Sequence, residues 1–403
     1  MCEWVPELTV GHDARSPLSG GPRARQRRYG GHIRTGARWL GTLVLGAGAQ
    51  TASAETFRVP SQVATIQAAI DGSATGDTVL VAPGVYTGEG FHDIRFTPDG
   101  AEPPRDLVVV SESGPELTVL DIQGTDEDNR RGFVFEEGET SASVVEGFTI
   151  RNGYMSLAPT RSDPAHEVSG GGIVIRGIGT SPIIRNCIFE SNHSQISGGA
   201  LEAEILASPT IESCVFLGNS SLQGGAISLE SNSAAVIRDC LLAGNTAGLC
   251  GGGIYFTAGG TIENTTIAGN HADQGGGVDA SFPASPTLRN VIVWGNCANT
   301  RGDEVFAQQF ATLTFECSLV GQDVDPDGTI NYDQDCIFED PLFCGLEDCE
   351  NAPSLDGYYA LQSNSPALQS ASSCGRIGAY GQGCGTMPVE AVSWSRLKSR
   401  FAR

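Results

Sequence analysis

GGALEAEILASPTIESCVFLGN, residues 198–219, decides the fold because nearly the same phrase recurs along the chain. Each copy opens on paired glycines, continues through short apolar runs and closes on an asparagine. Five copies fill residues 170–296, and they close at Asn192, Asn219, Asn245, Asn270 and Asn296. A period of 25 to 27 residues indicates a solenoid, in which each repeat stacks on its neighbours.

The composition of the repeat indicates strands and turns. Its apolar runs are short and rich in Val, Ile, Phe and Thr, with Gly, Asn, Ser and Pro between them. This pattern predicts an all-β parallel β-helix with three short strands per coil. The glycines are expected at positive φ or where neighbouring coils approach closely.

Two apolar columns place the core of each coil. Aligning the copies gives one column of Ile184, Ile211, Ile237, Ile262 and Leu288, and a second of Phe189, Phe216, Leu242, Ile267 and Val293. The columns are five residues apart, an odd number, so a bend must separate them. The bend is expected at the polar column of Asn186, Ser213, Asp239, Asn264 and Asn290 because Asn and Asp tolerate left-handed dihedrals.

Several motifs carry a family resemblance. The GGAL of residues 198–201, the GGAI of 224–227, and FESN and FLGN at 189–192 and 216–219 resemble motifs of chlamydial polymorphic outer-membrane proteins. The other copies depart from these motifs, with GGGI or GGGV and without the Phe. Residues 65–86, 146–153, 340–343, 363–367 and 377–380 resemble opening and closing coils of bacterial right-handed parallel β-helix proteins of the pectate-lyase-like superfamily. The resemblance covers roughly residues 55–385. It implies the fold, which hosts both enzymes and inert scaffolds.

The ends of the chain differ from the repeats. Residues 1–54 are interpreted as a signal peptide and leader, with a basic stretch, an apolar stretch at 39–49 and a small-x-small site before cleavage after Ala54. Residues 61–72 predict a short capping helix with Thr65 as N-cap and an apolar side made by Ile66, Ala69 and Ile70. Residues 386–403 form a basic tail, read either as an envelope anchor or as a frayed end.

Charge and Lys content limit the function. Residues 55–385 hold 13 basic and 43 acidic residues, so nucleic acid is excluded as an expected partner. The 13 are all Arg, and Lys398 is the one Lys in the chain. The resemblance implies that a lyase with a Lys base is excluded. In the repeats the Arg residues are scattered, and there is no tight Asp cluster near a His and an Arg of the kind that the resemblance implies for a glycoside hydrolase of this fold. One outward column is expected to pair charges between coils: Arg185, Glu212, Arg238, Glu263 and Arg289.

The cysteines indicate export. Cys187, Cys214 and Cys240 share one column and are expected to stack inside the coils as small apolar residues. The closing region, residues 317–385, is expected to be rich in disulfides, as in an oxidising compartment. The expected pairs join near neighbours in sequence: Cys344 with Cys349, Cys374 with Cys384, Cys317 with Cys336, and Cys250 with Cys297.

One motif suggests a metal. Asp323, Asp325 and Asp327 alternate before Gly328, as in the first half of a calcium loop, where carboxylates converge on a hard cation. The twelfth position is Gln334 and lacks the bidentate Glu. Two interpretations stay open, a structural Ca²⁺ site and an acidic surface loop.

Two functions of different classes remain. The first is a non-enzymatic β-helix protein, secreted or on the surface of a bacterium, that acts as scaffold, adhesin or glycan-binding module. Its expected partners are extracellular polysaccharide or cell-surface protein, with no transmembrane segment in the mature chain. The alternative is a polysaccharide lyase or glycoside hydrolase, for which no catalytic residue can be assigned. A groove with Arg beside two or more carboxylates would favour the enzyme.

Overall fold

The computed structural model describes residues 53–97, 103–157 and 168–384. All of them except Ser53 belong to one compact unit. The signal peptide up to residue 52 and the basic tail lie outside these residues, so both stay predictions. No helix among the described residues is long and apolar enough to cross a bilayer.

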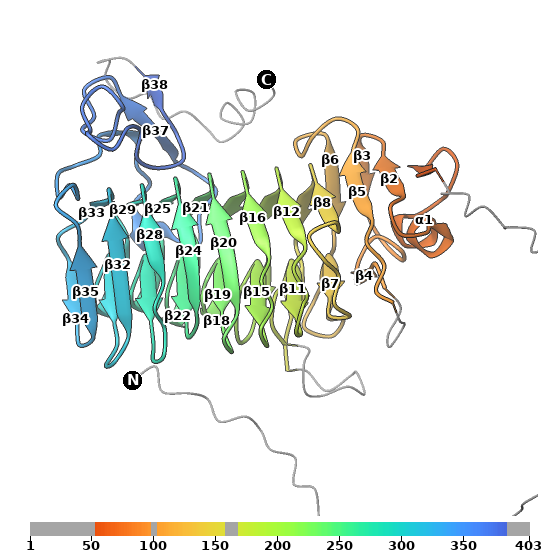
Figure 1. The fold of residues 1–403 in the computed structure, drawn as a ribbon, viewed down its shortest axis with the longest axis horizontal. Helices are drawn as coiled ribbons and strands as arrows, with labels where there is room; N and C mark the ends of the chain where they lie inside the picture. Colours follow the sequence, from red (N-terminus) through yellow and green to blue (C-terminus); the bar gives the residue numbers. More distant parts are fainter. Residues whose placement is uncertain (1–52, 98–102, 158–167, 385–403) are drawn as a thin grey trace, which may run out of the picture. The chain divides into compact units, whose positions relative to one another are not determined.

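The coils stack through four parallel sheets, named A to D here, and Figure 1 shows sheet A from β5 to β35 side by side. Sheet A consists of β1 (Thr56–Val59), β2 (Thr78–Val81), β5 (Val108–Ser111), β8 (Val144–Glu146), β12 (Ile183–Arg185), β16 (Thr210–Glu212), β20 (Ala234–Arg238), β24 (Gly259–Glu263), β28 (Thr287–Arg289), β32 (Thr312–Glu316) and β35 (Thr329–Tyr332). Sheet B consists of β3 (Gly84–Tyr86), β6 (Thr118–Asp121), β9 (Thr149–Arg151), β13 (Ile188–Glu190), β17 (Val215–Leu217), β21 (Leu241–Ala243), β25 (Thr266–Ala268), β29 (Ile292–Trp294) and β33 (Leu319–Val320).

The other two parallel sheets complete each coil. Sheet C consists of β4 (Ile94–Arg95), β7 (Phe133–Phe135), β11 (Ile173–Arg176), β15 (Leu201–Glu204), β19 (Ile227–Leu229), β23 (Ile254–Phe256), β27 (Val278–Ala280), β31 (Val305–Ala307) and β34 (Val324–Pro326). Sheet D consists of β10 (Tyr154–Met155), β14 (His193–Ser194), β18 (Ser220–Gln223), β22 (Thr246–Cys250), β26 (His271–Gln274) and β30 (Cys297–Arg301). The central coils therefore have four strands, not the expected three, because the chain bends again between sheets B and D.

The predicted core columns and bend are confirmed. Ile184, Ile211 and Ile237 are register partners in sheet A, and Phe189 and Phe216 are partners in sheet B, with their rings stacked 4.7 Å apart. Both columns are fully buried. The five residues of the polar column between them all have φ between 48° and 55°. The bend therefore arises where Asn, Asp and Ser tolerate the left-handed region.

An asparagine ladder makes the further bend between sheets B and D. The five closing asparagines are buried, and the N–H and Nδ2 of each donate to Oδ1 of the next at 2.9 to 3.1 Å. The Nδ2 atoms also donate to carbonyl groups of the preceding coil. At the last step, Asn296 Nδ2 donates to Glu304 Oε2 at 2.7 Å, so Glu304 ends the ladder.

The glycine pairs and the cap behave as expected. A Cβ on Gly199 would overlap the carbonyl oxygen of Gly225, so the second glycine permits close approach between coils. The helix α1 (Ile66–Gly72) begins at Thr65, whose side chain accepts a hydrogen bond from the Ala68 N–H, and lies beside β2 (Figure 1). Its buried face is Ile66, Ala69 and Ile70, as predicted.

The strands β33 to β35 still belong to the coils, so the closing region proper is residues 343–384, which pack on the outside of sheet B. It holds the small sheet E, with β36 (Phe343–Gly345), β37 (Tyr358–Gln362) and β38 (Gln382–Cys384), and the 3-10 helix η1 (Cys349–Asn351). Leu241, Ala268 and Ile292 on the outer face of sheet B form a second apolar cluster with Tyr359 and Leu361. Sheet B therefore carries apolar side chains on both faces: one face packs inside the coils and the other packs against the closing region.

The predicted disulfides are wrong. Three bonds join other partners: Cys297 with Cys349, Cys317 with Cys374, and Cys344 with Cys384. The bonds of Cys297 with Cys349 and of Cys317 with Cys374 link the last coils to the closing region. The spacing of the cysteines along the sequence does not indicate this linkage. Cys336 is free, and Cys187, Cys214 and Cys240 are free and buried in one stack, as predicted.

Candidate functional site

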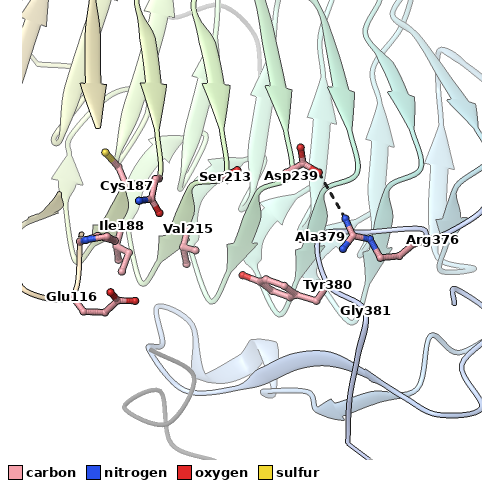
Figure 2. A pocket seen from close by; sticks show the side chains of 12 residues that line it. Glu116, Cys187, Ile188, Ser213, Val215, Asp239, Arg376, Ala379, Tyr380 and Gly381 are labelled. Atoms are coloured by element: carbon pink, nitrogen blue, oxygen red, sulfur yellow. Dashed lines mark ion pairs between the residues drawn. The ribbon is translucent and has the colours of Figure 1, made fainter. Parts of the chain in front are cut away.

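A cavity of about 440 Å³ opens between the outer face of sheet B and the closing region (Figure 2). One side is made by the bend column and by β13 and β17, and the other by residues 376–381. It lies beyond the coils that the second apolar cluster covers most fully. The volume falls within the range of small-ligand pockets, about 300 to 1,000 Å³.

The floor of this groove is apolar. Ile188 and Val215 are register partners at the start of β13 and β17 and belong to the second apolar cluster. The Cβ atoms alternate along a strand, so Phe189 and Phe216 point into the coils while Ile188 and Val215 point outward. The sequence phrases CIF and CVF thus supply the inner core and the groove floor together.

The bend column supplies a polar wall. Asn186, Ser213 and Asp239 occupy the same place in three successive coils, so they are spaced by about 4.8 Å, the distance between neighbouring strands. Asp239 Oδ1 lies 3.8 Å from Arg376 Nη2, and both side chains are about two-fifths exposed. Glu116, from the loop between β5 and β6, lies away from this pair in Figure 2.

Tyr380 is the aromatic group of the groove. Figure 2 shows it reaching from the closing region towards Val215. Burial raises the pKa of Tyr380, so the phenol keeps its proton and can donate a hydrogen bond. The neighbouring Gly381 also lines the cavity, where an added Cβ would meet only Arg376 Cδ, at 3.9 Å.

A separate charged cluster lies on the outer face of sheet C. Arg176 Nε is 3.3 Å from Glu204 Oε1, and these residues are register partners in β11 and β15. Glu202 lies on the same strand and is 3% exposed, and Glu230 follows β19 and accepts from Ser228 Oγ at 2.6 Å. A search of the sequence for Asp clusters near a His and an Arg does not find this group of one Arg and three Glu. Stacking brings together residues that lie one period apart.

The cluster has perturbed acidity. Burial, and then the charges of Glu204 and Glu230, raise the pKa of the Glu202 carboxyl well above its usual range. Burial also raises the pKa of Glu230. Glu202 Oε2 is buried and accepts no hydrogen bond within the described part of the chain. A carboxyl group with a raised pKa beside other acidic side chains is an arrangement that acid–base chemistry uses.

The candidate calcium ligands have another partner. Asp325 is in β34, and both its oxygens accept from Arg301, at 2.6 and 2.8 Å, while Asp327 also pairs with Arg301. This pairing lowers the pKa of Asp327. Burial, and then the charge of Asp303, raises the pKa of the Asp323 carboxyl group. The oxygens of the three aspartates do not converge on one point, so the Ca²⁺ site stays a prediction that would require Arg301 to move.

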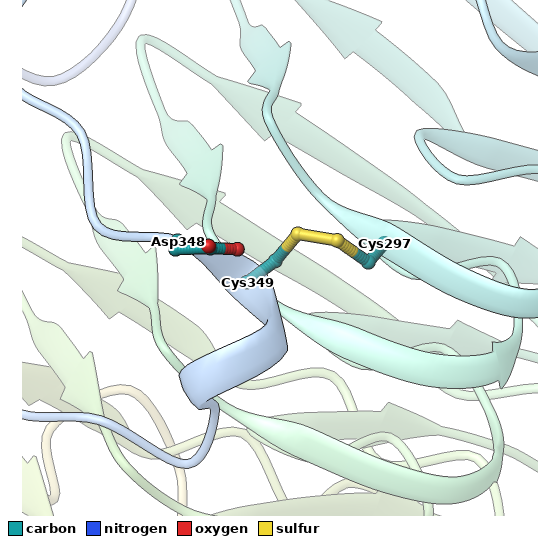
Figure 3. Close-up of side chains that lie close together, drawn as sticks. All are labelled: Cys297, Asp348 and Cys349. Atoms are coloured by element: carbon teal, nitrogen blue, oxygen red, sulfur yellow. A yellow bond between two sulfur atoms is a disulfide. The ribbon is translucent and has the colours of Figure 1, made fainter.

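Two other groups combine sulfur and carboxylate. Cys297 and Cys349 lie beside Asp348 in Figure 3, and Cys317 and Cys374 lie beside Asp335. In both groups the sulfurs are joined in a disulfide, so they offer no thiolate to a metal ion. Their role is to attach the closing region to the last coils.

Two of the comparisons with known proteins found a likeness. Residues 121–300 match the family model of the right handed beta helix region. A crystal structure of pectate lyase Pel9A is similar at 13% sequence identity and a TM-score of 0.41, covering 82% of this chain and 97% of that chain. No curated protein sequence matches, and the expected likeness to chlamydial outer-membrane proteins is not shown. The stacked parallel sheets, together with this match over residues 121–300, show that the fold is a right-handed parallel β-helix.

Proposed function

We propose that this protein is secreted or displayed on the surface of a bacterium, and that it binds an extracellular glycan without catalysis. The groove between sheet B and Tyr380 carries the proposal. Sugars present apolar C–H faces together with hydroxyl groups. An aromatic ring, an apolar floor and a row of polar side chains at strand spacing match both features.

The separation of the two sites favours binding over catalysis. An enzyme needs its perturbed carboxyl groups inside the cavity that admits the substrate. Here the cavity lies on the outer face of sheet B, whereas Glu202 and its neighbours lie on the outer face of sheet C. The carboxyl group with the raised pKa is also nearly inaccessible, at 3% exposure.

The extracellular location is supported by chemistry that suits an oxidising compartment. Three disulfides hold the described closing region, and such bonds persist mainly outside the cytosol. The signal peptide and an envelope contact through the basic tail are part of the same proposal.

Binding to an array of plant, fungal and bacterial glycans tests the proposal, with hits measured by calorimetry on the full chain. Tyr380→Ala is expected to weaken binding at least tenfold, whereas Tyr380→Phe keeps the ring and most of the affinity. Gly381→Phe removes no contact and fills the cavity, so it should abolish binding in a folded protein. Binding that survives Gly381→Phe would refute the groove as the site.

The alternative, a polysaccharide lyase or hydrolase, is favoured by one observation, the Arg176 cluster, in which burial raises the pKa of Glu202. The same glycans are incubated with the protein, and unsaturated products are followed by ultraviolet absorbance and reducing ends by colour. Product formation that Glu202→Gln abolishes would establish catalysis at sheet C. Absence of product across the panel would support binding alone.

A further inference from the structure

The charges of the groove are unequal. Glu116 and Asp239 contribute two carboxylates, and Arg376 contributes the one guanidinium among the lining residues. Arg376 is the ion-pair partner of Asp239, at 3.8 Å. Glu116 forms no ion pair with any residue that the structure describes, and Figure 2 shows it apart from the Asp239–Arg376 pair. The groove therefore keeps one uncompensated negative charge at the Glu116 end.

The other groups near this charge also suit a cation. Tyr380 lines the same cavity with an aromatic ring, and the face of such a ring attracts an ammonium group. Ile188 and Val215 give the charge an apolar surrounding, which strengthens its attraction for an opposite charge. A carboxylate and an aromatic ring beside an apolar floor can bind an amino group together with the apolar face of a sugar.

The charge of the whole solenoid acts in the same direction. With 13 basic and 43 acidic residues, residues 55–385 have a net charge of −30. Such a field repels polyanions at long range and attracts cations at moderate ionic strength. A polyuronate would meet this repulsion and then the free Glu116.

We infer that the groove selects a glycan with free amino groups, meaning hexosamine units without their N-acetyl groups, and that Glu116 pairs with the ammonium. This inference rests on the proposed glycan-binding function and names its substrate class. An N-acetylated unit has the same ring but no charge, so it is the natural comparison.

The test uses calorimetry on the full chain with three probes, a β-1,4-linked glucosamine tetramer, its N-acetylated counterpart and a galacturonate tetramer. The glucosamine tetramer is expected to bind at least tenfold more tightly than the N-acetylated one, and the galacturonate not at all. Glu116→Gln should remove the tenfold preference, so that the two glucosamine probes bind with similar affinity. Glu112→Gln, which changes an exposed carboxylate on the same loop, is the matched control and should have no effect.

The outcomes separate the two proposals. If both glucosamine probes bind equally and Tyr380→Ala weakens both, the groove binds glycans but the preference for amino groups is wrong. If the preference exists and Glu116→Gln leaves it intact, the assignment of Glu116 is wrong. If neither probe binds while another glycan does so in the groove, the amino-sugar class is wrong. If no glycan binds at all, both proposals are wrong.

Discussion

Removing one rung of the asparagine ladder should destabilise the protein strongly. In Asn245→Ala, the N–H and Nδ2 of Asn219 both lose their acceptor, Asn245 Oδ1, now at 2.9 Å from each. Both groups are buried, since Asn219 is 0% exposed. Each buried polar group left without a partner costs about 1 to 3 kcal/mol, so the free energy of unfolding should fall by about 2 to 6 kcal/mol.

Equilibrium unfolding in urea, followed by far-ultraviolet circular dichroism, measures this loss. Asn299→Ala is the matched control because Asn299 is an exposed asparagine of β30, beyond the ladder, and it should change stability by less than about 0.5 kcal/mol. Asn245→Asp keeps the shape of the side chain but replaces Nδ2, so Phe216 O and Asn270 Oδ1 lose the hydrogen bonds that they accept from it. At neutral pH, Asn245→Asp should lower the free energy of unfolding at least as much as Asn245→Ala does. Wild-type stability in either ladder variant would refute the reasoning.

Three further predictions concern the ends of the solenoid. Burial raises the pKa of Glu304 to about 7, above its value near 4.5 in an unfolded chain, so the folded protein binds more protons between these pH values. The stability that this protonation contributes is complete below pH 4.5 and is lost as the pH rises to about 7. Glu304→Gln should therefore flatten the dependence of the unfolding free energy on pH, measured by unfolding curves across that window. If Ca²⁺ binds at the aspartates, it should raise the melting temperature of Arg301→Ala more than that of the wild type, relative to chelator, because Arg301 no longer competes; equal shifts would contradict this. Peptide mapping without reduction should recover the three disulfides Cys297–Cys349, Cys317–Cys374 and Cys344–Cys384, and a peptide joining Cys317 to Cys336 would contradict the structure. The Cys317→Ser/Cys374→Ser variant should lose about 2 to 5 kcal/mol of the free energy of unfolding.

Structural features that recur in every repeat can be predicted from the sequence, whereas contacts between distant parts of the chain cannot. The inward columns, the bend at Asn186 and its equivalents, and the buried thiols all recur at one period, and the structure confirms them. The cap is readable because Thr65 and the apolar side of α1 are local signals. The disulfide pairs could not be predicted from spacing along the chain, because the closing region returns across sheet B and its cysteines bond to coil residues 52 and 57 positions away.

Two features were visible in the alignment without being recognised. The closing asparagine recurs in every copy, but a polar residue beside a turn gives no sign that its side chain is buried and hydrogen-bonded to the next coil. Arg176, Glu204 and Glu230 also share one column, but this neighbourhood is not visible within any single copy of the repeat. In a solenoid, a column is a line of neighbours about 4.8 Å apart, so charges should be compared down columns.

The same geometry explains why binding and acid–base chemistry are separated here. The inward columns and the ladder are constrained by packing and hydrogen bonds, which leaves the outward columns free to vary. On sheet B, the outward columns are apolar because the closing region covers them, and the groove forms where Ile188 and Val215 are less completely covered. On sheet C, an outward column carries Arg176, Glu204 and Glu230. A ligand in the groove cannot reach these carboxyl groups because the coil, with its filled core, lies between the two faces. A β-helix can therefore hold a binding site and a carboxylate cluster in the same coils without making them one active site.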